Sequence, residues 1–231
     1  MTVGKTAIVL GATGVVGREL VEQLTELAQI DKVISITRRP IEYTDSKVTN
    51  RVVNFGKLED YVDTFKGDIL FSCLGTTLKL AGSIKQQRLV DVDYQYRAAK
   101  IALNNGVSHY LLVSSSGANA NSRNAYLKMK GELELKVIAL NFPQTSILQP
   151  SLLLGERKDF RLGEKLASAL LPLISKIPKL KKYRPITGKQ VAIKMCRVAL
   201  SNIVDNEPEN QQMKIQYYRL DELFDSSLVR N

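Results

Sequence analysis

The chain has 231 residues, of which 44% are hydrophobic and 24% are charged, a composition typical of a single globular domain with a sizeable core. No apolar run approaches the roughly 18 residues of a membrane span, and the N-terminus lacks the pattern of a secretory signal. Two cysteines, far apart, and one histidine argue against a metal site and fit a reduced, cytoplasmic setting. The net charge of +10 could reflect nucleic acid, an acidic membrane surface, or an anionic cofactor and substrate. Much of it lies in residues 176–184, which match no nucleic-acid motif and are expected to form a solvated connector, so nucleic acid is not the expected partner.

The first predicted strand, residues 6–10, runs directly into a glycine pattern spaced G-x-x-G-x-x-G. Gly11 allows a tight turn, Gly14 lets the backbone approach a pyrophosphate, and Gly17 lets the next helix pack closely on the sheet. An amphipathic stretch at residues 15–27 follows, and its N-terminus offers free N–H groups to phosphates. An ordinary strand-to-helix turn is the alternative, but the strand, turn and helix in this order favour dinucleotide binding.

The second predicted strand, residues 32–37, indicates which dinucleotide is bound. Arg38 and Arg39 follow it, and no Asp or Glu occurs between residues 33 and 41. An acidic residue here would bind the ribose 2′-hydroxyl of NAD, whereas a guanidinium suits the 2′-phosphate of NADP. A solvated arginine pair is the alternative. The pattern favours NADP(H).

Strand-like and helix-like segments alternate along the rest of the chain. Further strands are expected at residues 50–53, 69–73, 110–114 and 145–149, and helices at 58–65, 90–105, 125–140, 161–177 and 188–202. This rhythm predicts an α/β fold, a Rossmann-type doubly wound parallel sheet. We expect one NAD(P)-binding domain over residues 1–231, with a cofactor-binding core at 1–154 and a small substrate-covering C-terminal part at 155–231.

A candidate catalytic pair follows the strand at 110–114, which ends in the serine run 114–116. Tyr126 and Lys130 lie four residues apart at the start of the next helix, so they share a face. A phenol has a pKa near 10, and a neighbouring ammonium favours its phenolate. Such a tyrosine can exchange a proton with a substrate oxygen that a strand-end serine holds. A surface helix pair is the alternative, but the position after the serine strand favours catalysis.

Together these motifs resemble the short-chain dehydrogenase/reductases. More narrowly, the chain is similar to the atypical branch of the Tat-interacting-protein oxidoreductases, close to the NmrA-like NAD(P)-binding proteins. Besides the glycines and the Tyr/Lys pair, the segments that carry the resemblance are Arg38-Arg39, Cys73-Leu74-Gly75-Thr76-Thr77, Val92-Asp93, His109 with Ser114-Ser115, Tyr126 to Glu132, and Pro150 before Leu152–Leu154.

The resemblance implies contacts to each part of the cofactor. The residues implied for the pyrophosphate are Thr13, Gly14, Val15 and Val16, and those for the 2′-phosphate are Arg38 and Arg39. Leu74, Gly75 and Thr76 are implied beside the nicotinamide ribose, and Pro150 with Leu153 beside the carboxamide. It further implies that Lys130 holds ribose hydroxyls in addition to acting on Tyr126. Ser115 matches the family serine, and Ser116 could serve if the strand end shifts by one residue.

The sequence therefore predicts an NADPH-dependent oxidoreductase that acts on a small carbonyl or alcohol substrate. The alternative is an NADPH-sensing regulator that binds a protein partner without turnover. Basic residues at Arg157, Lys158 and Arg161 allow an anionic substrate. His109, the lone histidine, is expected to be structural, and Cys73 to be a small core residue.

Overall fold

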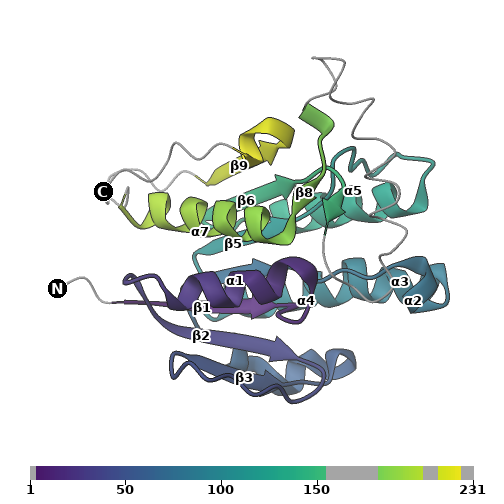
Figure 1. Ribbon diagram of the computed structural model, residues 1–231. Helices are drawn as coiled ribbons and strands as arrows, with labels where there is room; N and C mark the ends of the chain where they lie inside the picture. Colours follow the sequence, from purple (N-terminus) through teal and green to yellow (C-terminus); the bar gives the residue numbers. More distant parts are fainter. Residues whose placement is uncertain (1–3, 155–181, 205–212, 225–231) are drawn as a thin grey trace.

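The computed structural model describes residues 4–154, 182–204 and 213–224 (Figure 1). Its centre is a seven-stranded sheet in the order β3-β2-β1-β4-β5-β6-β9, and every strand pair in it is parallel. The strands are β1 Lys5–Leu10, β2 Ile30–Thr37, β3 Val48–Val52, β4 Ile69–Ser72, β5 His109–Val113, β6 Gln144–Gln149 and β9 Lys214–Arg219. The predicted α/β fold with a doubly wound parallel sheet is confirmed.

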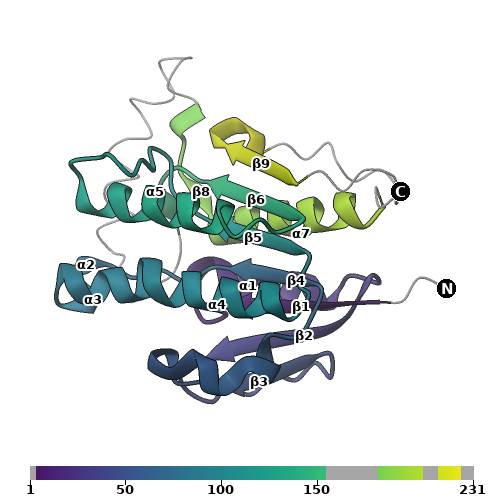
Figure 2. The ribbon, with the colours of Figure 1, turned by 180° about the vertical axis from the view of Figure 1, so that it is seen from behind.

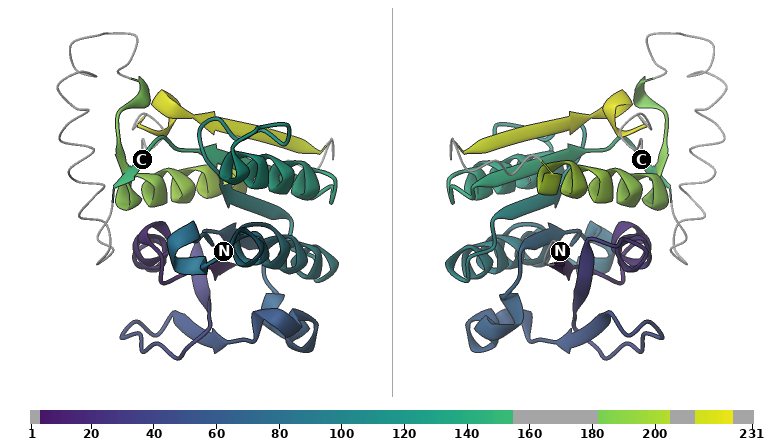
Figure 3. Two further views of the ribbon diagram at one scale, coloured as in Figure 1. Left: turned by 90° about the vertical axis from the view of Figure 1, so that its right-hand side faces the viewer. Right: turned by 90° about the vertical axis from the view of Figure 1, so that its left-hand side faces the viewer.

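Helices cover both faces of this sheet. On one face lie α1 (Val15–Thr25) and α7 (Gly188–Val204), which appear in front in Figure 1. On the other face lie α4 (Tyr94–Asn104) and α5 (Ala125–Ile138), which Figure 2 shows from behind. The 3₁₀ helix Phe55–Phe65 packs against α4 on that same side. Figure 3 shows these layers on both sides of the strands.

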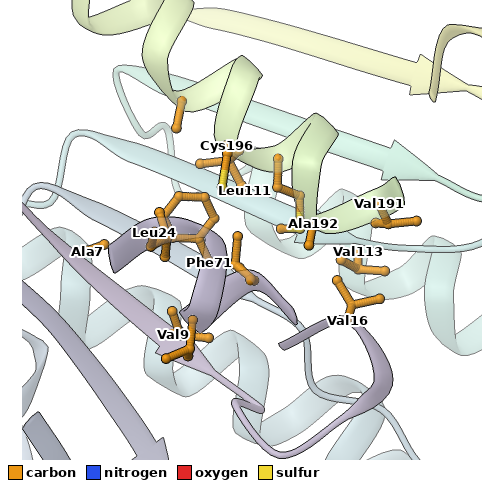
Figure 4. Close-up of a cluster of buried hydrophobic side chains, with 14 of the residues drawn as sticks. Ala7, Val9, Val16, Leu24, Phe71, Leu111, Val113, Val191, Ala192 and Cys196 are labelled. Carbon is orange, nitrogen blue, oxygen red and sulfur yellow. The ribbon is translucent and has the colours of Figure 1, made fainter. Parts of the chain in front are cut away.

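The strands alternate their side chains between two apolar clusters. Val9, Phe71 and Leu111 face α1 and α7, and Figure 4 shows them with side chains of those helices. The intervening Ile8 and Leu70 face the 3₁₀ helix, α4 and α5. Because both faces are buried, the central strands are nearly continuous apolar runs, which is typical of parallel sheets.

The order of the strands creates a cleft at their carboxyl ends. From β1 the chain continues outward through β2 and β3, and it then returns to the other side of β1 with β4. The loops that follow β1 and β4 therefore diverge. Ligands of open α/β sheets bind at such a switch point.

The described parts of the C-terminal region complete the layers of the sheet. The predicted helix at 188–202 is confirmed as α7, which packs against α1, and β9 adds the edge strand beside β6. Close packing begins at Gly188, where an added Cβ would lie 2.2 Å from the carbonyl oxygen of Val15. A two-stranded parallel sheet joins β7 (Leu153–Leu154) to β8 (Ile186–Thr187). The helix expected at 161–177 lies outside the described residues, so the division of the domain at residue 154 stays a prediction.

Two features of the segment between β4 and β5 differ from the prediction. Two short helices, α2 (Leu78–Ala81) and α3 (Ile84–Arg88), occupy what the sequence left without regular structure. The helix expected at 90–105 begins with a π-helical turn, Leu89–Asp93, before α4. Such turns are rare in proteins, and those that occur are often found at functional sites.

Candidate functional site

The turn between β1 and α1 is shaped by close backbone contacts. Gly11 has a positive φ of 84°, and the amide of Gly14 donates to its carbonyl oxygen at 2.9 Å. A Cβ on Gly17 would lie 2.2 Å from that same oxygen, so the first turn of α1 tolerates no larger residue there. The N-cap residue of α1 is Gly14, which has no side chain to cap the helix, and the first turn of α1 holds no acidic residue. The N–H groups of this helix are left available to an anion.

The first cavity, of about 400 Å³, runs from this turn across the end of β2. Among the predicted cofactor residues, its lining contains Gly11, Thr13, Gly14, Arg38, Leu74, Gly75 and Thr76. Arg39 is exposed and does not line it, and its carbonyl oxygen accepts a 2.7 Å hydrogen bond from Thr37 Oγ1. Gly17 lies behind the turn rather than on the cavity wall.

The second cavity, of about 870 Å³, continues from the first past residues 73–76, which line both. Among the predicted site residues, its lining contains Val15, Val16, Leu74, Gly75, Thr76, Ser115, Tyr126, Lys130, Pro150 and Leu153. Segments from β1–α1, β4–α2, β5–α5 and β6–β7 thus meet here. The structure brings the predicted catalytic residues to one wall of a cavity that adjoins the glycine turn.

The serine run sits where β5 ends, and its three members differ in their contacts. Ser114 is buried and donates a hydrogen bond to the carboxyl group of Glu134 on α5. Ser115 is half-buried, and its hydroxyl lies 3.4 Å from the carbonyl oxygen of Ser116. The amide of Ser116 donates to Pro150 at 2.8 Å. Because all three line the second cavity, the structure leaves Ser115 and Ser116 both open as the carbonyl-holding residue.

Glycine at position 131 lets the serine loop pass close to α5. A Cβ there would lie 2.2 Å from the backbone nitrogen of Ala120 and 2.3 Å from the carbonyl carbon of Asn119. Asn124 caps the same helix, since its Oδ1 accepts from the amides of Tyr126 at 3.0 Å and Leu127 at 3.2 Å. These contacts fix the loop that carries the serines relative to the helix that carries the Tyr/Lys pair.

Tyr126 and Lys130 differ sharply in exposure. The Tyr126 side chain lies at the cavity surface and is 37% exposed, whereas Lys130 is 3% exposed. The Lys130 ammonium lies 5.9 Å from the centre of the Tyr126 ring. It also lies 3.4 Å from the carbonyl oxygen of Val113 at the end of β5. An ammonium at this distance can act electrostatically on the phenol.

Asp91 is a site residue that the sequence did not single out. It lies in the π-helical turn before α4, is fully buried, and places Oδ1 3.6 Å from the Lys130 ammonium. The Thr76 amide lies 3.4 Å from its Oδ2, and a Cβ on Gly75 would approach Oδ1 to 3.4 Å. Asp91 therefore joins the loop after β4 to the helix α5. Burial raises the pKa of its carboxyl group, and the nearby Lys130 charge opposes that rise.

Three other titratable groups near the sheet have a structural explanation. Burial raises the pKa of the Cys73 thiol well above its ordinary value, so the thiol stays protonated. Burial also raises the pKa of Glu134, whose carboxylate accepts from Gln149 at 2.9 Å. His109 is buried at the start of β5 and bonds to Ser146 at 2.9 Å, and burial lowers its pKa to about 3. The imidazole is neutral and takes no part in either cavity.

These residues fit a bound dinucleotide. A glycine turn with free helical N–H groups opens onto a cavity at the switch point, and it leads to a second cavity with a phenol and an ammonium. The fold and the site define a dinucleotide-binding protein of the Rossmann class. Within the described ranges, no helix is long and apolar enough to cross a membrane, and no cluster of three metal-ligating side chains occurs.

Comparison with known proteins gives the family. The family model described as NAD(P)H-binding matches residues 11–160. HTATIP2 of Rattus norvegicus is 39% identical over 167 residues, which are 71% of this chain and 69% of the rat protein. FMP52 of Candida glabrata, whose name places it in mitochondria, is 37% identical over 211 residues, 87% of this chain and 88% of that protein. The chain belongs to the NAD(P)H-binding family and is a homologue of HTATIP2 and FMP52, so the predicted resemblance is confirmed.

Solved structures show the same fold at low sequence identity. MoeE5 in complex with UDP-glucuronic acid and NAD has a TM-score of 0.67 and 16% identity, over 93% of this chain and 76% of MoeE5. A short chain dehydrogenase family protein from Francisella tularensis has a TM-score of 0.65 and 14% identity, over 93% of this chain and 97% of that one. The sheet and its helical layers therefore have the same fold as these solved structures.

Proposed function

We propose that this chain is an NADPH-dependent oxidoreductase that interconverts a small carbonyl compound and the corresponding alcohol. The observation that carries the proposal is the placement of Tyr126 and Lys130 on the wall of the second cavity, which continues into the cavity beside the glycine turn. Family membership supports the dinucleotide, and the pair of side chains supports the chemistry.

The chain's residues have distinct tasks in this reaction. Tyr126 gives a proton to the carbonyl oxygen during reduction and takes it back during oxidation. Lys130 places its positive charge 5.9 Å from the centre of the Tyr126 ring and binds ribose hydroxyls. Ser115 holds the substrate oxygen, or Ser116 does so in its place. When bound, the dinucleotide supplies the hydride for reduction of the carbonyl carbon or accepts it in the reverse direction.

A preference for NADPH over NADH rests on the end of β2. Arg38 lines the first cavity, and its guanidinium can form two parallel hydrogen bonds to a phosphate. No acidic side chain occurs between residues 33 and 41 to bind a ribose 2′-hydroxyl in its place.

The test is a turnover assay with NADPH and a panel of aldehydes and ketones, followed by nicotinamide absorbance. Tyr126→Phe is expected to lower kcat by at least about a hundredfold while NADPH binding is retained. Tyr96→Phe is the matched control, because Tyr96 forms the same four-residue spacing with Lys100 on α4, away from the cavity wall. Retained binding without turnover by the native protein would instead favour the NADPH-sensing regulator.

We also infer a cytoplasmic location from the sparse cysteines, although the fungal relatives carry mitochondrial names. Subcellular fractionation of the natural source decides between the two compartments.

A further inference from the structure

The charges that line the second cavity cancel. Within residues 4–154, 182–204 and 213–224, the charged side chains on its wall are Asp91 and Lys130. Their carboxylate oxygen and ammonium nitrogen lie 3.6 Å apart, and their side chains are 0% and 4% exposed. A charged group on a substrate bound in this cavity would have no free partner here, because Asp91 and Lys130 already pair with each other. Leaving such an ion unpaired in a cavity is costly.

The rest of the wall is largely apolar, and much of this apolar surface is accessible. Leu78 and Ile84, on α2 and α3, are 50% and 55% exposed, and they line the same cavity. Leu152, just before β7, and Tyr183, shortly before β8, also line it and are 36% and 45% exposed. Exposed apolar side chains gathered around a cavity mark a binding surface for an apolar ligand.

Uncharged polar side chains line this wall in several places, with Thr76, Thr77, Gln87 and Ser151 apart from a group of four near the catalytic pair. Ser115, Ser116, Asn124 and Tyr126 lie where β5 leads into α5. They offer hydroxyl and amide groups to a single polar atom of a ligand. The apolar side chains Leu78 and Ile84 lie on other elements, α2 and α3.

We propose that the substrate is an uncharged carbonyl compound with an apolar body, such as a medium-chain aldehyde or ketone. This proposal rests on the proposed oxidoreductase function and names its substrate class. The carbonyl oxygen meets the hydroxyl group of Tyr126 and that of Ser115 or Ser116. The hydrocarbon part lies against Leu78, Ile84 and Leu152. An anionic substrate would depend on Arg157, Lys158 and Arg161, which lie outside the described residues.

A matched pair of substrates tests the class. Hexanal and 6-oxohexanoate have the same chain length, but only the second carries a carboxylate. With NADPH, we expect kcat/KM for hexanal to exceed that for 6-oxohexanoate by at least about a hundredfold. Equal values, or a preference for 6-oxohexanoate, would overturn the proposal.

The Asp91→Asn variant tests whether charge cancellation is the cause. Without the carboxylate, the Lys130 ammonium is unopposed, so discrimination against 6-oxohexanoate should fall by about tenfold. Asp93→Asn is the control, since Asp93 lies two residues further along, is half-buried and is not on the cavity wall. It should leave the ratio unchanged. An equal ratio in the native and Asp91→Asn proteins would remove Asp91 from the explanation.

Binding of unreactive analogues separates the substrate class from turnover. In the NADPH complex, hexanamide should bind more tightly than hexanoate, and Asp91→Asn should shift the ratio of their affinities toward hexanoate by about tenfold. If no carbonyl compound is turned over but this preference holds, the oxidoreductase function fails and the ligand class stands. If turnover occurs but hexanoate binds better, the substrate class fails alone.

Discussion

The two cavities meet at residues 73–76 but are built in different ways. The first depends on backbone. Gly11, Gly14 and Gly17 form one turn in which carbonyl oxygens, amides and absent side chains set the shape. Most of these contacts lie within a few residues of one another along the chain, and one reaches further, because a Cβ on Gly11 would lie 2.7 Å from the backbone of Cys73 and Leu74.

The second cavity depends on side chains that come from distant elements. Lys130 on α5 pairs with Asp91 in the π-helical turn, and Asp91 in turn lies beside Thr76 after β4. The serines come from the end of β5. Each side chain is placed by a different strand or helix, so the chemistry depends on the packing of the whole sheet.

The first cavity tolerates less sequence change than the second. A backbone turn binds a feature that every dinucleotide has, the pyrophosphate, and almost any substitution at Gly11 or Gly17 disrupts it. Side chains such as Leu78 and Ile84 can be replaced without moving the backbone. We expect relatives to share the first region and to differ in ligand through the second.

Alanine substitutions at two glycines should have the largest effects and should affect the two cavities differently. At both Gly17 and Gly131, an added Cβ would lie 2.2 Å from a backbone atom. The cost of this steric clash exceeds the stability that alanine gains over glycine from its higher helix propensity. Each change should cost about 3 kcal/mol of unfolding free energy, measured by denaturant titration. Gly17→Ala should abolish NADPH binding, whereas Gly131→Ala should keep NADPH binding and lose turnover, because it displaces the serine loop.

Gly106→Ala is the control for these variants. Gly106 has a φ of 85°, and an added Cβ there would meet nothing within 4 Å. The change should cost about 1 kcal/mol of backbone strain and leave both functions intact. Loss of NADPH binding in Gly131→Ala would contradict the separation of the two regions.

The same difference explains what could be predicted from the sequence. The glycine turn, the arginine after β2 and the four-residue spacing of Tyr126 and Lys130 are local patterns with a known geometry. Asp91 has no local signal. It occurs in a stretch with helical periodicity, and its importance depends on Lys130 and Thr76, which only the folded sheet brings to it.

The short helices α2 and α3 did have a local signal. Thr77 caps α2 by accepting from the amide of Leu80, and Ser83 caps α3 by accepting from that of Gln86. A serine followed three residues later by glutamine is a helix-start pattern. The strand β9 has weaker cues, because its place at the sheet edge depends on pairing with β6.

A buried histidine that lines neither cavity should make the stability of the fold depend on pH. His109 lies at the amino end of β5, and burial, with a smaller effect from the Lys214 charge, lowers its pKa to about 3. Between about pH 6.5 and 3 the unfolded chain binds a proton on this imidazole and the folded chain does not, so stability falls as the pH falls through that range. At pH 5 the loss from His109 should be about 2 kcal/mol.

The measurement is the unfolding free energy at pH 7 and pH 5 for the native protein and for His109→Gln. Carboxyl groups titrate in both proteins, so only the difference between the two pH dependences reports His109. NADPH affinity at pH 7 should be the same in both. If both proteins lose stability equally between these pH values, the imidazole is not held neutral by burial.

The two arginines after β2 give the smallest and most specific test of the first region. Arg38 lines the first cavity and Arg39 does not, although both are exposed and adjacent. Arg38→Ala should weaken NADPH binding by about tenfold and leave NADH binding nearly unchanged, because only NADPH has the 2′-phosphate that the guanidinium would bind. Arg39→Ala, the matched control, should weaken NADPH binding much less, as measured by fluorescence titration with each cofactor. Equal losses of NADPH and NADH in Arg38→Ala would mean that this side chain does not contact the 2′-phosphate. The preference for NADPH would then have to come from another part of the turn.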